Sequence, residues 1–251
     1  MDEIYNMACP ASPVHYQYNP IKTIKTSVMG AINVLGLAKR VKAKVLQAST
    51  SEVYGVSDDP IWTEESKSLI GPPTKLRWSY AASKLIDEFL ALSEFNDGKL
   101  NPIIVRLFNI IGNNQLSKFG MVVPKFIEAA LENKPLIIHG DGTQTRSFTW
   151  VGDVVNYFYL LAEKQLYGEI FNIGTGKPKQ IKLIIKKINK IINRGVPNYG
   201  KIKMRKDEIM KLYPNINKAK TKLNWRPKIS FEKGLKKTIN YYQKLSYGKK
   251  S

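Results

Sequence analysis

The stretch "NPIIVRLFNIIG", residues 101–112, decides the fold because it is apolar almost throughout. A strand that alternates apolar and polar residues buries one face, whereas a nearly continuous apolar run suits a parallel sheet that is covered on both faces. The stretch "KVLQAST", residues 44–50, is predicted to be a second strand, and "DEIYNMA", residues 2–8, a shorter third one. Together they predict parallel strands with helices on both sides.

Helical segments separate these strands along the chain. Residues 19–41 have a proline suited to a first helical turn and apolar residues near one face, and a second helix is predicted over residues 78–94. Strand, helix, strand, helix, strand is the order of a doubly wound α/β sheet. We therefore expect residues 1–112 to form part of a Rossmann-type parallel sheet. Residues 113–251 are expected to form mainly a smaller subdomain, interleaved with late sheet elements.

The chain is strongly basic, with a net charge of +20 and a pI near 9.8. Such a charge can indicate a nucleic-acid partner, an anionic substrate or a lysine-rich proteome. Most of the excess lies in residues 181–194 and 201–223, where lysines alternate with isoleucine and leucine at helical spacing. This pattern is typical of amphipathic helices with a solvated basic face. Since no zinc-finger spacing or aromatic-glycine RNA motif accompanies it, we expect no nucleic-acid partner.

Cysteine usage and hydropathy limit the environment of the protein. Cys9 is the single cysteine, so no internal disulfide can form, and without a neighbouring histidine or cysteine cluster it gives no metal site. The opening "MDEIYNMACP" is acidic and lacks the long apolar core of a signal peptide, and no apolar run could span a bilayer. These features predict a soluble cytoplasmic protein with no membrane contact.

The stretch "RWSYAASKLIDEF", residues 77–89, carries the first candidate chemistry. Tyr80 and Lys84 stand four residues apart in a helical composition, so their side chains share one face. A nearby ammonium favours the phenolate and lowers the pKa of a tyrosine from about 10. The pair suits proton abstraction, although the spacing alone also fits an ordinary helix.

Four further motifs surround this pair in a fixed order. They are "ASTSEVYG" (48–55), "RLFN" (106–109), "GDGTQTRSF" (140–148) and "NIGTG" (172–176). With "SYAASK" (79–84), the set resembles the extended short-chain dehydrogenase/reductase family of nucleotide-sugar-modifying enzymes. The resemblance runs from about residue 2 to about residue 245 and is most similar to the UDP-glucuronate decarboxylases, also called UDP-xylose synthases.

This resemblance implies an NAD-dependent lyase that converts UDP-glucuronate to UDP-xylose through a 4-keto sugar. Tyr80 would be the general base at the C4 hydroxyl, and Lys84 would supply positive charge and reach the nicotinamide ribose. Thr50 and Ser51 would hydrogen-bond the C4 oxygen, at the strand end where such sheets bind ligands. Glu52 would be the acidic residue that decarboxylases and dehydratases tend to have there.

The resemblance also assigns residues around the two ligands. The cofactor would be bound by Tyr80, Lys84, Thr26, Ala8 and Ser49. The UDP-sugar would be bound by Ala11, Ser12, Lys25, Asn109 and Arg146. An arginine suits the diphosphate because its guanidinium presents a fork of donors. A homodimer through the helices at 24–40 and 78–95 is implied as well.

Two positions depart from the decarboxylase pattern. Leu212, beside Lys211, and Met121 stand where decarboxylases usually have arginines. Both departures weaken the decarboxylase interpretation relative to a UDP-sugar 4-epimerase of the same family. A 4,6-dehydratase of this family is the other enzymatic alternative.

A dinucleotide-binding sheet normally opens with a strand and a Gly-x-Gly-x-x-Gly turn that approaches the pyrophosphate. No such motif precedes Tyr5, and the glycine pairs "GDG" and "GTG" follow later strands. We therefore expect a fragment, a protein whose N-terminal half is a separate chain, or a truncated form. A non-catalytic nucleotide-sugar-binding or subunit-like protein is the alternative from another class.

Overall fold

The computed structural model describes residues 1–56, 59, 61–204 and 208–248, with the backbone alone at 198–201, 247 and 248. The chain divides into two compact units. The first comprises residues 1–108, 156–173 and 214–225, and the second comprises residues 109–155, 174–213 and 226–251. The assignment of cofactor binding to residues 1–112 and of mainly substrate binding to residues 113–251 stays a prediction.

The first unit is built on a parallel sheet in the order β1-β2-β3-β7. The strands are β1 (Glu3–Asn6), β2 (Lys44–Thr50), β3 (Pro102–Leu107) and β7 (Ile170–Ile173). The residues of β2 and β3 are nearly all buried, as the apolar runs in the sequence predict. The predicted α/β class with parallel strands is confirmed.

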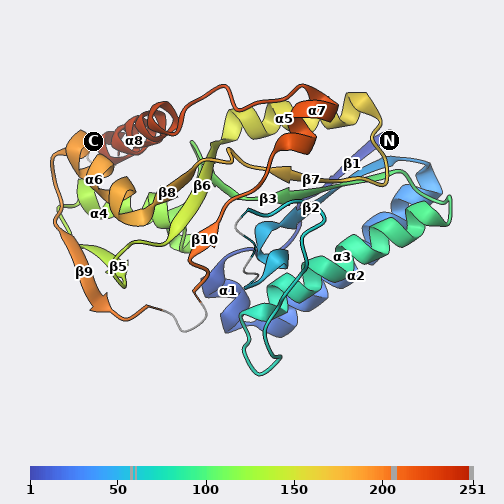
Figure 1. Ribbon diagram of the computed structural model, residues 1–251, viewed down its shortest axis with the longest axis horizontal. Helices are drawn as coiled ribbons and strands as arrows, with labels where there is room; N and C mark the ends of the chain where they lie inside the picture. Colours follow the sequence, from blue (N-terminus) through green and yellow to red (C-terminus); the bar gives the residue numbers. More distant parts are fainter. Residues whose placement is uncertain (57–58, 60, 205–207, 249–251) are drawn as a thin grey trace. The chain divides into compact units, whose positions relative to one another are not determined.

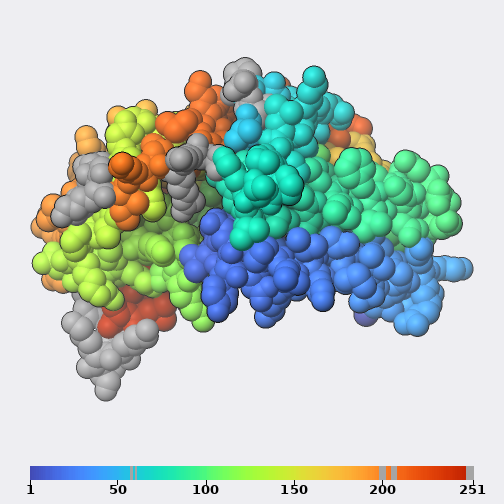
Figure 2. All heavy atoms as spheres, turned by 90° about the horizontal axis from the view of Figure 1, so that it is seen from below, coloured from blue at the N-terminus to red at the C-terminus, as the bar shows by residue number. Residues whose placement is uncertain are grey.

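Helices cover both faces of this sheet (Figure 1). On one side lie α2 (Pro20–Val41) and α3 (Trp78–Asn96), which run along each other (Figure 2). On the other side lie α7 (Asn217–Leu223) and residues 156–164 of α5 (Val151–Lys164). Two short helices, α1 (Pro13–Tyr18) and the 3₁₀ helix η1 (Ser51–Tyr54), follow the carboxyl ends of β1 and β2. Ligands of doubly wound sheets bind at this end of the strands.

The second unit has two smaller sheets. One contains β4 (Asn109–Ile111), β6 (Thr145–Trp150), β8 (Pro178–Gln180) and β10 (Lys211–Leu212), and the other pairs β5 (Leu136–His139) with β9 (Pro197–Ile202). Its helices are η2 (Ser117–Phe119), α4 (Val122–Leu131), α6 (Ile181–Ile192) and α8 (Phe231–Gly248). Buried side chains of α4, α6 and α8 meet those of β5 and β6 in one apolar core.

The structure corrects two sequence predictions and adds short helices. Residues 101–112 are not one strand: the amide of Phe108 donates to the carbonyl of Ile173, and from Asn109 the chain pairs with β6 in another sheet. Residues 201–223 are helical only from Asn217, because Pro214 cannot continue a helix and residues 211–212 pair with β6. Residues 205–207 of that stretch lie outside the described part of the chain. Helix α1 was not predicted.

Among the described residues, no helix combines the length and the apolar composition that crossing a membrane requires.

Candidate active site

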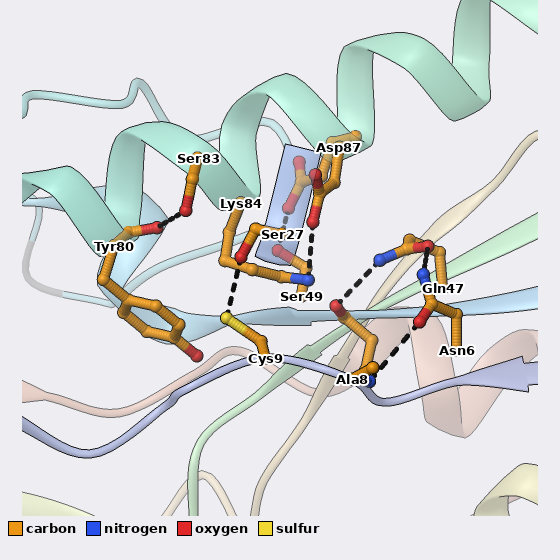
Figure 3. A network of polar contacts seen from close by, with 12 residues as sticks. Asn6, Ala8, Cys9, Ser27, Gln47, Ser49, Tyr80, Ser83, Lys84 and Asp87 are labelled. Atoms are coloured by element: carbon orange, nitrogen blue, oxygen red, sulfur yellow. Dashed lines mark hydrogen bonds and ion pairs between the residues drawn. The ribbon is translucent and has the colours of Figure 1, made fainter. Parts of the chain in front are cut away.

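Tyr80 and Lys84 lie one turn apart on α3, and Figure 3 shows both side chains projecting from the same side of the helix. Tyr80 is 7% exposed and Lys84 is 3% exposed. Both polar groups are therefore held in an environment where hydrogen bonds and charges act more strongly than in water.

Tyr80 is fixed by contacts from two other elements. Its ring stacks on that of Tyr16 from α1, with centroids 5.0 Å apart and planes inclined by 5°. Its phenol hydrogen-bonds the hydroxyl of Thr50 at the end of β2. Burial raises the pKa of Tyr80, and the hydrogen bond with Thr50 opposes that rise. The lowered pKa that the sequence predicted from Lys84 is therefore not found in this structure.

Lys84 is paired with an acidic residue of its own helix. Its ammonium lies 2.7 Å from Oδ2 of Asp87, and the two side chains are 4% and 1% exposed (Figure 3). Cys9 lies close by, with its sulfur 2.7 Å from the hydroxyl of Ser27. Burial raises the pKa of the Cys9 thiol, while the charge of Lys84 opposes that rise.

The residues after β2 separate into different roles. Ser49 is buried and its hydroxyl donates to the carboxylate of Glu88, so it belongs to a packed ion pair under α3. Thr50 faces Tyr80, and its hydroxyl also accepts the amide of Glu52 at 3.3 Å. Ser51 is buried at the start of η1.

Glu52 follows at the surface of this strand end and is half-buried. Its Oε2 lies 3.3 Å from Nη2 of Arg77, the residue before α3, and the guanidinium of Arg77 lies over the ring of Trp78. The carboxylate is thus held at the carboxyl end of β2, close enough to Tyr80 for its charge to raise the pKa of that phenol.

The predicted residues around β1 and α2 are less enclosed. Ala8 is exposed, and its amide donates to the side chain of Asn6 at 3.3 Å. Ser12 is buried, and its carbonyl accepts the amides of the first turn of α1. Thr26 is half-buried, whereas Ala11 and Lys25 are exposed. The structure therefore groups Thr50, Tyr80 and Lys84, and it leaves Ala11 and Lys25 at the surface.

Asn109 and Arg146 belong to the second unit. Oδ1 of Asn109 is buried and lacks a hydrogen-bond partner among the described residues, so it can accept a donor from a ligand. The guanidinium of Arg146 pairs with Glu208 and donates to the carbonyl of Ile209 at 2.7 Å. Its predicted role toward a diphosphate stays a prediction.

Three residues of this site were missed in the sequence. Tyr16 lies on α1, a short helix that was not predicted, and Arg77 directly precedes α3. Asp87 could have been found, because residues three apart on a helix are neighbours and an acid at that distance from Lys84 is a natural partner.

An apolar pocket of the first unit lies away from this cluster. It is lined at the amino ends of the strands by residues that include Ile4, Val45 and Ile103. None of the predicted site residues lines it, and parallel sheets of this kind bind ligands at the opposite end.

Comparisons with known proteins agree with the geometry. Residues 1–238 match the family model of GDP-mannose 4,6 dehydratase. The chain is 38% identical over 253 residues to UDP-glucuronic acid decarboxylase 4 of Arabidopsis thaliana, covering 99% of this chain and 55% of that protein. It thus spans about half the length of this curated relative.

Solved structures give the same fold. UDP-glucuronic acid 4-epimerase from Bacillus cereus, in complex with UDP-glucuronic acid and NAD, matches with a TM-score of 0.87 and 28% identity, over 98% of this chain and 76% of that one. UDP-glucose 4-epimerase from Thermotoga maritima, with UDP-glucose, matches with a TM-score of 0.88 and 28% identity, over 98% and 78%. The chain therefore belongs to the extended short-chain dehydrogenase/reductase family of NAD-dependent epimerases and dehydratases.

Proposed function

We propose that this chain acts in NAD-dependent nucleotide-sugar modification, and that its reaction is the decarboxylation of UDP-glucuronate to UDP-xylose. The observation that carries the proposal is the buried cluster of Tyr80, Lys84 and Thr50 at the carboxyl end of β2. The identity to UDP-glucuronic acid decarboxylases supports the choice of substrate.

The described residues fit the nicotinamide-ribose side of NAD. Oδ1 of Asp87 is buried without a hydrogen-bond partner, and Lys84 has ammonium N–H groups beyond the one that Asp87 accepts, as far as the described chain shows. A ribose hydroxyl can both donate and accept, so it suits such a pair. The sequence contains no Gly-x-Gly-x-x-Gly motif, so the proposal is limited to this side of the cofactor.

In the proposed mechanism, Tyr80 takes the proton of the C4 hydroxyl, and Thr50 keeps the phenol in place by its hydrogen bond. NAD, when bound, supplies the reversible oxidation of the sugar at C4. With C4 oxidised, the ketone lies β to the C6 carboxylate. Cleavage of the C5–C6 bond then releases carbon dioxide and leaves its electron pair in the enolate of C5, C4 and O4.

The proposal assigns later steps to groups near the reacting carbons. Protonation at C5 restores the ketone, and the proton on Tyr80 returns to O4 when C4 is reduced. Ser51 and Thr50 would hydrogen-bond O4, and Glu52 lies at the same strand end as a candidate acid at C5. Asn109 and Arg146 would hold the sugar and the diphosphate.

A 4-epimerase or 4,6-dehydratase is the second candidate, and two residues favour it. Leu212 is a buried residue of β10, in register with Arg146 of β6, and Met121 precedes α4. Neither can pair with the carboxylate of a glucuronate as an arginine would. A 4-epimerase would use the same Tyr80 and would return the C4 proton and electrons on the other face.

We also propose that the chain forms a homodimer through α2 and α3. Both helices present large apolar side chains to solvent: Ile21, Ile24, Met29, Ile32, Ile86 and Phe89. The two helices lie next to each other in Figure 2, so both can contribute to one interface of the first unit. Sedimentation velocity of the purified chain would test this proposal.

The test of the function is incubation with NAD and UDP-glucuronate, followed by chromatography and mass spectrometry. Decarboxylation gives a UDP-pentose, whereas 4-epimerisation gives an isomer of unchanged mass that elutes separately. Tyr80→Phe should lower turnover by about 10²- to 10⁴-fold, the usual contribution of a positioned acid or base. Tyr18→Phe is the matched control, because Tyr18 is 88% exposed on α1.

Each outcome has a separate meaning. Formation of the isomer without any UDP-pentose would contradict the decarboxylase proposal and would favour the 4-epimerase. If the chain binds UDP but does not turn over UDP-glucuronate in the presence of NAD, the non-catalytic nucleotide-sugar-binding alternative is favoured. Equal activity of Tyr80→Phe and Tyr18→Phe would exclude Tyr80 as the base.

A further inference from the structure

The ion pair between Lys84 and Asp87 lies in the interior of the first unit. Lys84 Nζ is 2.7 Å from Asp87 Oδ2, and both side chains are nearly inaccessible to solvent (Figure 3). Tyr80 precedes Lys84 by one helical turn. Tyr80 and Lys84 carry the proposed chemistry, whereas Asp87 has so far been named only as the partner of Lys84 on the nicotinamide-ribose side.

Helix stability does not account for this pair. Pairs at this spacing stabilise an exposed helix only slightly, and they do so best when the acid precedes the base along the helix. Here the lysine precedes the aspartate. Burying both charges also carries a desolvation cost that their attraction often fails to recover. The arrangement is therefore a poor choice for stability alone.

The hydrogen bonds of the pair are incomplete. Oδ1 of Asp87 is buried with no partner among the described residues, whereas most buried polar atoms of folded proteins are hydrogen-bonded. Burial raises the pKa of Asp87, and the charge of Lys84 opposes that rise. The carboxylate is thus retained in an unfavourable place and depends on Lys84 for its charge. The dependence is mutual, because removing the acidic partner would leave the buried charge of Lys84 uncompensated.

We propose that Asp87 is a positioning residue that keeps the Lys84 ammonium charged and directed within the site beside Tyr80. The proposal rests on the proposed function, because it names the residue that holds Lys84 in place for that function. Asp87 itself acts through Lys84 and need not touch the sugar.

Other titratable or charged groups face this cluster from the surrounding elements, and they also contribute to the pH dependence of the rate. They are Cys9 after β1, Tyr16 of α1, Glu52 of η1, Tyr80 and Glu88 of α3, and Arg106 of β3.

The first test is spectroscopic and needs no activity. In the full chain labelled with ¹⁵N-lysine, a buried and hydrogen-bonded ammonium exchanges its protons slowly and gives a ¹H–¹⁵N signal, which Lys84→Met assigns. Asp87→Asn should abolish or strongly shift the Lys84 signal. Glu94→Gln is the matched control, because Glu94 lies on the same helix and pairs with Lys39 at 2.6 Å in a half-exposed place. An unchanged Lys84 signal in Asp87→Asn would overturn the proposal.

The second test is kinetic and uses UDP-glucuronate with NAD. Asp87→Asn should lower kcat by about 10- to 100-fold, by analogy with the loss of the hydrogen-bonding partner that orients a metal ligand. KM for the sugar nucleotide should stay within about 2-fold, since Asp87 is not proposed to bind it. The pH–rate profile should also change, because the Lys84 ammonium in the site of Tyr80 is then no longer held by an acidic partner.

Different results separate the two proposals. An unchanged kcat and pH profile in Asp87→Asn would overturn the role of Asp87. A loss of activity with an unchanged pH profile, matched by a loss of thermal stability, would show a structural role and would also overturn it. If the wild-type chain shows no turnover, the decarboxylase proposal fails, and the ammonium signal alone decides whether Asp87 holds Lys84.

Discussion

Helix α3 contributes to two buried ion pairs, Lys84 with Asp87 and Glu88 with Arg106 of β3, and their hydrogen bonding differs. In the first, Lys84 and Asp87 share one short contact, and one carboxylate oxygen has no partner among the described residues. In the second, both oxygens of Glu88 are bonded by Arg106, with Nε at 3.0 Å from Oε1 and Nη2 at 2.7 Å from Oε2.

The second pair is also completed by its neighbours. Ser49 donates to Glu88, the carbonyl of Glu64 accepts from Nη1 of Arg106 at 2.9 Å, and the guanidinium lies over the ring of Tyr54 at 4.8 Å. A planar guanidinium satisfied in this way connects α3 to β2 and β3. The difference indicates that the pair between Glu88 and Arg106, none of whose polar atoms is buried without a partner, maintains the fold, whereas the incompletely bonded pair is available to a ligand.

The largest effect should come from breaking the pair between Glu88 and Arg106, called the complete pair below. In Glu88→Gln the guanidinium of Arg106 stays buried without a counter-charge, so the free energy of unfolding should fall by about 3–5 kcal/mol. Urea denaturation followed by circular dichroism measures this change. Glu94→Gln, which breaks the half-exposed pair with Lys39 on the same helix, should cost no more than about 1 kcal/mol. Equal losses in the two variants would show that the Glu88 pair is not special for the fold.

The sequence predicted most of the elements around these pairs. The strand at 44–50 and the helices that became α2, α3 and α6 agree with their local patterns, because apolar spacing and terminal residues such as Pro20 act over short distances. The end of β3 could not be predicted in this way. The run 101–112 is apolar almost throughout, and its division at Phe108 depends on distant partners, β7 and β6.

The sequence predicted which residues belong to the candidate site, but not which contacts they make. Tyr80 and Lys84 lie where their spacing and motif implied, but the stacking of Tyr16 and the partner of Lys84 come from tertiary packing. Ser49 shows the limit most clearly. Its motif suggested the cofactor, whereas its buried hydroxyl bonds Glu88. A motif identifies which residues belong together, and packing decides which of their atoms are free.

Ser49→Ala tests that division with a smaller effect. Removing a hydrogen bond to a charged carboxylate should lower the free energy of unfolding by about 1.5–3 kcal/mol. Ser83→Ala is the matched control, because Ser83 is also buried but donates to a neutral acceptor, the carbonyl of Tyr80, at 2.9 Å. Its loss should be smaller, since alanine also favours the helix. If Ser49→Ala proves no more destabilising than Ser83→Ala, Ser49 does not support the complete pair, and its predicted contact with the cofactor regains priority.

The smallest effect concerns how the stability of the incomplete pair depends on pH. Because burial raises the pKa of Asp87, the folded protein binds a proton at this carboxyl more readily than the unfolded chain does. The stability that Asp87 contributes is then fully present below the ordinary carboxyl pKa of about 3.9, and it is lost as the pH rises through the raised value, by at most about 1.4 kcal/mol per pH unit. An asparagine at position 87 does not titrate, so the free energy of unfolding of Asp87→Asn should increase relative to that of wild type as the pH rises from about 4 toward 7. Urea denaturation of both proteins across this range measures the difference. A relative decline of the variant with rising pH would mean that the folded protein stabilises the Asp87 carboxylate, and the contrast between the two pairs of α3 would then be lost.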